Sequence, residues 1–159
     1  MRVEIKFEKF KKEILRGLAA VSKTGGNPAL KGIYLEAMGG ALVVRSTNID
    51  IGFESTILCK VETEGKFLIS GESLGRLLSA VNTKQAAMCV IDYQNNVCNI
   101  TVEGHVFNLK TLVLENFPNL PVISGVEVKV DKKVFLTGVR SVLYSVAKSE
   151  IKPEISGVY

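Results

Sequence analysis

The chain has 159 residues, of which 47% are hydrophobic and 23% charged, as is usual for a globular protein with a hydrophobic core. Its net charge of +4 mildly favours an acidic partner such as nucleic acid. The N-terminal residues lack the apolar segment of a signal peptide, and no run approaches the roughly 18 apolar residues of a membrane span. We therefore expect a cytoplasmic protein without a membrane partner.

The cysteine and histidine content argues against a metal or disulfide protein. The chain has three cysteines, Cys59, Cys89 and Cys98, with no CxxC pair, and His105 is its only histidine. An odd number of cysteines without a signal peptide is typical of a reducing compartment. We expect no disulfide framework, no metal site and no cofactor.

The first part of the chain predicts a strand, a helix and three further strands. Residues 2–7 alternate polar and apolar side chains, which indicates a half-buried strand. The helix expected over 8–23 has apolar residues at helical spacing, namely Phe10, Ile14, Leu18 and Val21. A loop rich in glycine and proline follows. Three strand-like runs then complete this part: 32–38, 41–47 and 48–61.

The same order then begins again. A strand over 66–70 precedes a helix over 72–81, with Ser70 as its N-cap. The apolar face of that helix consists of Leu74, Leu77, Leu78 and Val81. Three more strands are expected at 86–93, 97–102 and 105–113. The chain therefore predicts an α+β domain over 1–113, built from two strand–helix–three-strand repeats at about 1–61 and 62–113.

A third unit is expected to begin after residue 113. The stretch 114–125, LENFPNLPVISG, has the prolines, asparagines and glycine of an extended linker. A strand over 126–130 and a helix over 131–148, with Asp131 at its N-cap, would follow. That helix would turn four residues toward a core: Val139, Val142, Leu143 and Val146. A new strand would start at Ile155, so residues 126–159 are predicted to be the truncated start of a second domain.

The positive charge is concentrated on the expected helices. Those three helices carry ten basic and four acidic residues, whereas the rest of the chain carries ten basic and twelve acidic residues. At 100° per residue, four basic residues of the first helix fall within about 60° of one another, opposite its apolar stripe: Lys9, Lys12, Arg16 and Lys23. Two interpretations stay open: a solvated helix face, or a surface that meets phosphates without reading sequence.

Motifs for catalysis do not converge. Asp50 and Glu54 are expected on one strand at a spacing that places them on the same side, and Asp92 lies on a later strand. A metal-dependent hydrolase or nuclease could use these three carboxylates, and this is the weaker alternative. A stand-alone protein-interaction module, pairing through its open strands, is the other alternative. We expect no enzyme and no catalytic residue.

Three stretches carry a family resemblance: STNIDIGFES at 46–55, LENFPNLP at 114–121, and SVAKSEIKPEISGVY at 145–159. In this order they resemble the N-terminal part of the bacterial DNA polymerase III beta subunit family, the beta sliding clamps. Asn48 stands where the family usually has aspartate, and Lys152 where arginine is common.

This resemblance implies the DNA-clamp fold, with antiparallel sheets outside and helices inside. It implies a non-catalytic processivity factor whose dimeric ring encircles duplex DNA and tethers the replicative polymerase. The polymerase III and clamp-loader sites of the family lie mostly in regions that this chain lacks. We therefore expect an N-terminal fragment of a homodimeric clamp.

The resemblance, together with the basic helix faces, also implies site residues. Asn27 falls where the family often has a DNA-contacting arginine, so Lys23 or Lys31 would compensate. The expected DNA contacts are Lys12, Arg16, Lys23, Asn27, Arg140, Lys148, Ser149 and Lys152. The expected subunit-interface residues are Ser73, Leu77 and Phe107.

Overall fold

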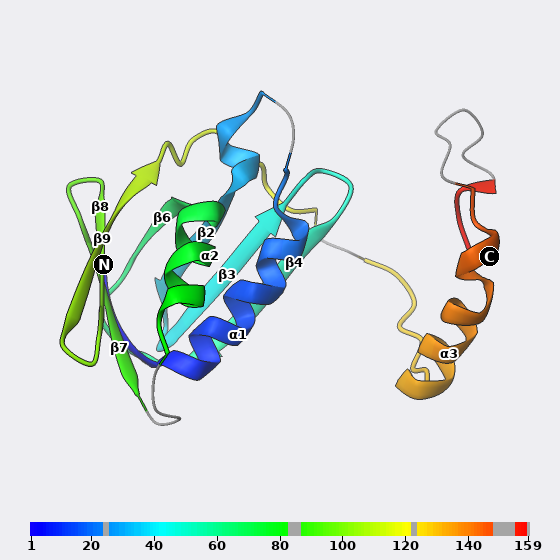
Figure 1. Cartoon of the computed structure of the whole chain (residues 1–159), viewed down its shortest axis with the longest axis horizontal. Helices are drawn as coiled ribbons and strands as arrows, with labels where there is room; N and C mark the ends of the chain where they lie inside the picture. The colour runs from blue at the N-terminus through cyan, green and yellow to red at the C-terminus, as the bar shows by residue number, and fades with distance from the viewer. Residues whose placement is uncertain (24–25, 83–86, 122–123, 148–154, 159) are drawn as a thin grey trace. The chain divides into compact units, whose positions relative to one another are not determined.

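A computed structural model of the chain describes residues 1–23, 26–82, 87–121, 124–147 and 155–158. The chain divides into two units, Met1–Leu120 and Pro121–Tyr159. Figure 1 shows that the first unit contains all the labelled strands together with α1 and α2, whereas α3 belongs to the second.

The first unit follows the predicted order of strand, helix and strands, twice over. Two short 3-10 turns, Leu18–Ala20 and Pro28–Lys31, connect the first helix to the sheet. The helices and strands of the unit are β1 (Arg2–Lys6), α1 (Phe7–Gly17), β2 (Gly32–Met38), β3 (Ala41–Thr47), β4 (Gly52–Leu58), β5 (Lys60–Thr63), β6 (Gly65–Ser70), α2 (Gly71–Ala80), β7 (Met88–Gln94), β8 (Val97–Val102) and β9 (His105–Leu112).

The strands form one antiparallel sheet in which the two repeats exchange their first strands. The order is β4-β3-β2-β6-β9-β8-β7-β1-β5. β1 pairs with β7 of the second repeat, with Ile5 opposite Cys89. β6 pairs with β2 of the first repeat, with Ile33 opposite Ile69. Each repeat therefore supplies one strand to the other.

The strand expected over 48–61 is divided in two. β4 pairs with β3, and β5 pairs with β1 at the other end of the order. The chain changes partner at Cys59, which is why the strand is interrupted there. The expected start at residue 48 is also wrong, because the Asn48 side chain accepts a hydrogen bond from the Ile51 N–H (2.8 Å) and closes a turn before β4.

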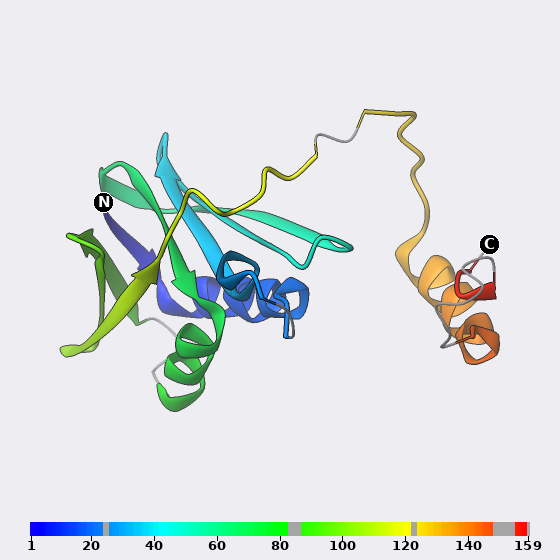
Figure 2. The same cartoon turned by 90° about the horizontal axis from the view of Figure 1, so that it is seen from above.

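Helices α1 and α2 lie side by side on one side of the sheet and build the main core with it (Figures 1 and 2). Phe10 and Ile14 of α1 are fully buried, as are Leu74 and Leu78 of α2. Leu18, Val21 and Val81 are half-buried and pack against the same core. The predicted apolar face of α2 is confirmed, and so is the Ser70 N-cap, whose hydroxyl accepts from the Ser73 N–H (3.3 Å). The helix expected over 8–23 ends at Gly17, so Leu18 and Val21 reach the core from the 3-10 turn and the residue after it, not from a helix face.

A second, smaller core lies on the opposite face of the sheet. Tyr34 and Leu68 alternate with residues that face the helices, and they are buried together with Ala29. Leu112, Leu114 and Phe117 pack against them. The stretch 114–120, the first part of the expected linker, therefore lies against the first unit.

The second unit contains α3 (Lys132–Val142) and a 3-10 turn (Leu143–Ser145). The predicted N-cap is confirmed, because the Asp131 carboxylate accepts from the Lys133 and Val134 N–H groups (2.9 and 3.0 Å). The helix is shorter than the expected 131–148. In the described part of the chain, no helix is long and apolar enough to cross a membrane.

Two strands expected in the second unit are wrong. Residues 126–130 form no strand, and neither do the described residues 155–158. A strand needs a partner for its backbone N–H and C=O groups, and this unit has no other strand among its described residues. The expected core face of α3 is not buried either: Val142 and Leu143 are exposed, and Val139 and Val146 are half-buried.

Candidate nucleic-acid interface

The solvent face of α1 is basic. Lys9, Lys12 and Arg16 are exposed on the side of the helix opposite the buried Phe10 and Ile14. The apolar stripe fixes α1 to the sheet, and the cations therefore point away from it. Lys23 is exposed but does not belong to this face, because α1 ends at Gly17 and a 3-10 turn follows. Its predicted place on the helical wheel is wrong for that reason.

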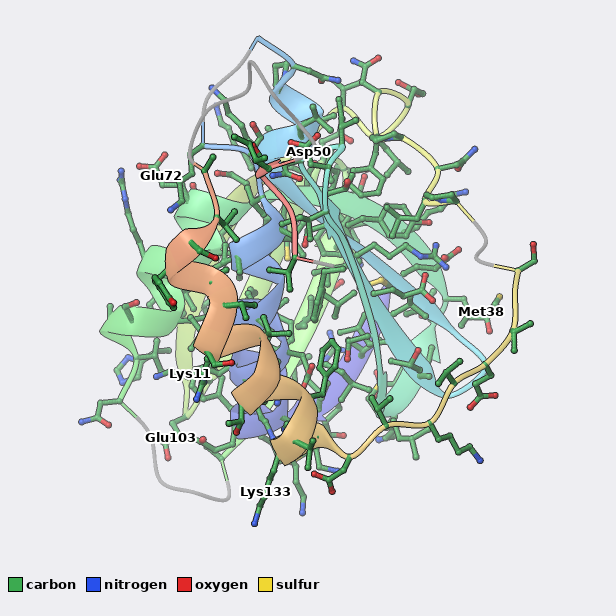
Figure 3. The ribbon with its side chains drawn as sticks, turned by 90° about the vertical axis from the view of Figure 1, so that its right-hand side faces the viewer. Lys11, Met38, Asp50, Glu72, Glu103 and Lys133 are labelled. Carbon is green, nitrogen blue, oxygen red and sulfur yellow. The ribbon has the colours of Figure 1, made fainter. Side chains whose placement is uncertain are left out.

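Lys11, which Figure 3 labels, makes contacts within the fold, unlike the exposed Lys9 and Lys12. Its ammonium group donates to the Val81 carbonyl (3.3 Å), just beyond the end of α2, and lies 5.8 Å from the centre of the Phe7 ring. This half-buried lysine joins the two helices. The sequence contains no local signal for this contact, since the two residues are 70 positions apart.

Arg16 is held in a small polar network. One of its guanidinium nitrogens donates to a carboxylate oxygen of Glu13 (3.0 Å), and the Ser55 hydroxyl of β4 donates to the other oxygen (3.0 Å). The Arg16 side chain is 57% exposed, whereas that of Glu13 is 17% exposed. Sequence reasoning named Arg16 and missed Glu13 and Ser55, although the i, i+3 spacing of Glu13 was an available signal.

The end of α1 is fixed by a second serine. The buried Ser46 of β3 donates its hydroxyl to the Gly17 carbonyl (2.6 Å). A side chain at Gly17 would meet the Phe53 ring at 3.3 Å, so the helix end lies close against the sheet. The residues of the basic face are therefore carried by a helix anchored to β3 and β4.

Asn27 and two lysines lie near the start of α2. The Asn27 side chain accepts from the Ala29 N–H (2.9 Å) and caps the turn Pro28–Lys31. Lys23 and Lys31 are exposed and line one pocket of about 540 Å³. Its other lining residues are Leu18, Val21, Ser22, Pro28, Ser70, Glu72 and Leu112. Lys23 and Lys31 thus line the same pocket, and compensation for Asn27 by either of them remains a prediction.

The residues expected at a subunit interface lie on α2 and β9. Leu77 belongs to the main core, with 7% of its surface exposed, and Ser73 is half-buried. Phe107 is half-buried, packs against the core and lies opposite Ile100. In the part of the chain that the structure describes, residues 105–110 of β9 pair with β8 alone. Their interface role remains a prediction.

In the second unit, Arg140 is exposed on α3, and its contact with DNA remains a prediction. Lys148, Ser149 and Lys152, the other three expected contacts there, lie outside the described residues.

The three carboxylates of the nuclease alternative do not gather. Asp50, which Figure 3 labels, lies in the turn before β4. It therefore shares no strand face with Glu54, and that expectation is wrong. Glu54 pairs with Arg45 at 2.5 Å, and this hydrogen bond raises the pKa of the Arg45 guanidinium. Asp92 pairs with Arg2 at 2.9 Å. No metal-binding group of three or more histidine, cysteine or acidic residues is present within the described ranges.

Comparison with known proteins identifies the family. The model of the DNA polymerase III beta subunit, N-terminal domain, matches residues 1–121. The chain belongs to this family. The beta sliding clamp of Treponema pallidum (strain Nichols) is 26% identical over 160 residues, which cover 100% of this chain and 43% of that protein.

Solved sliding clamps have the same fold. The Caulobacter crescentus pol III beta structure matches with a TM-score of 0.85 at 17% identity, covering 94% of this chain and 40% of that one. The Helicobacter pylori beta clamp bound to a DNA ligase peptide matches with a TM-score of 0.83 at 18% identity, covering 97% and 42%. The resemblance and the clamp fold are therefore confirmed, and the chain spans about two fifths of the length of these relatives.

Proposed function

We propose that this beta subunit chain is the N-terminal part of a sliding clamp that encircles duplex DNA and keeps the replicative polymerase on its template. The observation that carries the proposal is the basic face of α1, defined by Lys9, Lys12 and Arg16, on a helix whose opposite side is buried in the core. Flexible cations on a helix contact phosphate oxygens and carry no base code. Such contacts suit a protein that must slide.

The proposal assigns no catalytic step to the chain. The protein would act in the bacterial cytoplasm as a homodimeric ring. It would stay on DNA because the ring encloses the duplex, with weak contacts to the phosphates. Lys12, Arg16, Lys23, Lys31 and Arg140 would supply weak phosphate contacts, together with Asn27, Lys148, Ser149 and Lys152. Ser73, Leu77 and Phe107 would support the subunit interface beside the first half of β9.

Capture of the polymerase and the clamp loader is proposed for parts of the family's proteins that this chain does not match. The Helicobacter pylori relative bound to a DNA ligase peptide supports peptide capture as the way in which such clamps recruit enzymes.

Charge reversal tests the proposal. We expect the chain to bind duplex DNA of any sequence at low salt, and the double variant Lys12→Glu/Arg16→Glu to bind at least about tenfold more weakly, because two cations of the α1 face become anions that repel phosphates. The matched control is Lys66→Glu/Lys110→Glu, which changes the net charge equally on two exposed strand residues. Fluorescence anisotropy with a labelled duplex measures both. An equal loss in the two variants would mean that net charge, and not the α1 face, controls binding.

A second function, pairing with another protein segment, is favoured by the exposed apolar side chains of the second unit. Val134, Phe135 and Tyr144 are 72%, 55% and 88% exposed. Under this alternative, Lys12→Glu/Arg16→Glu leaves partner binding unchanged, whereas polar substitutions at these three positions abolish it in a pull-down with the purified partner.

A further inference from the structure

We propose that Glu13 weakens the contact of the Arg16 guanidinium with DNA phosphates. As a result, α1 contributes one phosphate contact fewer than its exposed basic residues suggest. This inference rests on the proposed function. It is carried by the polar network of Glu13, Arg16 and Ser55, in which an acidic side chain lies within the basic face and is fixed in place.

The geometry places the carboxylate beside the guanidinium. The Glu13 side chain is 17% exposed, and each of its oxygens accepts one hydrogen bond at 3.0 Å, from Arg16 and from Ser55. Because Ser55 belongs to β4, the carboxylate is held from the sheet as well as from its own helix. An approaching phosphate therefore meets an arginine whose charge is already balanced by a neighbour.

The other acidic residue of α1 provides a contrast. Glu8 lies in the first turn of the helix and is exposed. No hydrogen bond or ion pair of Glu8 is found among the described residues. Replacing either glutamate by glutamine raises the net charge by one, but only the change at Glu13 removes a charge from the side of Arg16. Glu8→Gln is thus a matched control for Glu13→Gln.

The measurable consequence is the salt dependence of DNA binding. Each phosphate contact adds about 0.9 to the slope of log affinity against log salt on duplex DNA. If the Glu13→Gln change frees Arg16 for one full phosphate contact, the salt slope of this variant is steeper than that of Glu8→Gln by about 0.9. Between about 50 and 200 mM salt, this variant then loses about 3.5-fold more affinity than the control.

The experiment uses the whole chain, a labelled duplex and fluorescence anisotropy across this salt range. We expect Glu13→Gln to bind more tightly than Glu8→Gln at low salt and to show the steeper slope. In an Arg16→Gln background the two glutamine substitutions should become equivalent, because the pair that Glu13 forms is gone. Ser55→Ala should steepen the slope by less than Glu13→Gln does, because Glu13 keeps its charge beside Arg16 at helical spacing and loses only the hydrogen bond from β4.

Three results would overturn the inference: equal slopes for Glu13→Gln and Glu8→Gln, a gain that survives in the Arg16→Gln background, or a Ser55→Ala slope as steep as that of Glu13→Gln. These results leave the proposed function intact, since the unmodified chain still binds DNA. Failure of the unmodified chain to bind duplex DNA at about 10 mM salt, where phosphate contacts are strongest, would overturn both proposals together.

Discussion

The ring of Phe117 stacks on the ring of Tyr34, with centroids 5.3 Å apart and planes 20° apart. The Arg45 guanidinium also lies over the Tyr34 ring, 5.5 Å from its centroid. Burial raises the pKa of the Tyr34 hydroxyl, and the side-chain hydrogen bond with Glu36 raises it further. The stack holds residues 114–120 against the face of the sheet opposite α1 and α2, so this stretch contributes to the stability of the first unit.

We predict that Phe117→Ala lowers the free energy of unfolding by about 2 kcal/mol, roughly half the cost of truncating a fully buried phenylalanine, because Phe117 is half-buried. Asn116→Ala, at the exposed neighbouring position, should change it by less than about 0.5 kcal/mol. Urea titration followed by tyrosine fluorescence measures both values. Equal stability of the two variants would mean that the stack does not hold the segment.

Two serines that donate to glycine carbonyls provide a test of burial. Ser46 is fully buried and donates to Gly17, whereas Ser79 is exposed and donates to Gly75 within α2. We predict that Ser46→Ala costs about 1–3 kcal/mol, because it leaves the Gly17 carbonyl unpaired in the interior. Ser79→Ala should be nearly neutral, since water replaces its hydroxyl. Thermal melting measures the stability of both variants. An equal drop in melting temperature would contradict the role of burial.

The core thiols predict a loss of stability in alkali. Burial raises the pKa of Cys89 and of Cys98 from the ordinary 9.0 to about 12. The folded chain therefore keeps these thiols protonated, whereas the unfolded chain ionises them above pH 9. The free energy of unfolding is unaffected by them below pH 9, and between pH 9 and 12 it falls by up to about 1.4 kcal/mol per pH unit for each thiol.

Denaturant titrations at several pH values measure this slope. A Cys89→Ala/Cys98→Ala double variant should be less stable at neutral pH but should show a flatter decline above pH 9. An unchanged slope in that variant would assign the alkaline loss to other groups.

The N-cap of α3 predicts a local effect. Asp131 accepts two backbone hydrogen bonds at the start of a helix that has no buried residue. Asp131→Ala should therefore lower the stability of this helix by about 1 kcal/mol, visible as lost far-ultraviolet circular dichroism. Asp50→Ala, an exposed aspartate in a turn, serves as the control and should keep the full helical signal. Equal signals from the two variants would show that the cap is not needed.

The sequence predicted the first unit well because each of its elements carries a local pattern. The buried stripes of α1 and α2 repeat at helical spacing, and Ser70 is a strong N-cap. The break at Cys59 in the strand expected over 48–61 could not be predicted, because it depends on a change of pairing partner from β3 to β1. The alternating residues 126–130 predicted a strand, but alternation cannot supply the partner that a strand requires.

The candidate interface was predictable in charge and not in contacts. Lys12 and Arg16 follow from helical geometry once the apolar stripe is known. The network around Arg16 requires Ser55, 42 residues beyond Glu13, and the tether of Lys11 requires Val81. Such pairs are formed by the tertiary fold and leave no pattern in neighbouring residues.

The exchange of first strands also sets a schedule for synthesis on the ribosome. β1 is the first strand of the unit to be synthesised. Ile5 cannot pair until Cys89, its partner on β7, has been made 84 residues later. At bacterial and eukaryotic elongation rates of 5–20 residues per second, this delay is about 4 to 17 seconds. During that time β1 can at most be joined by β5, at the edge. The first repeat therefore cannot complete its folding alone, and the nascent domain matures as a single event once the second repeat has emerged.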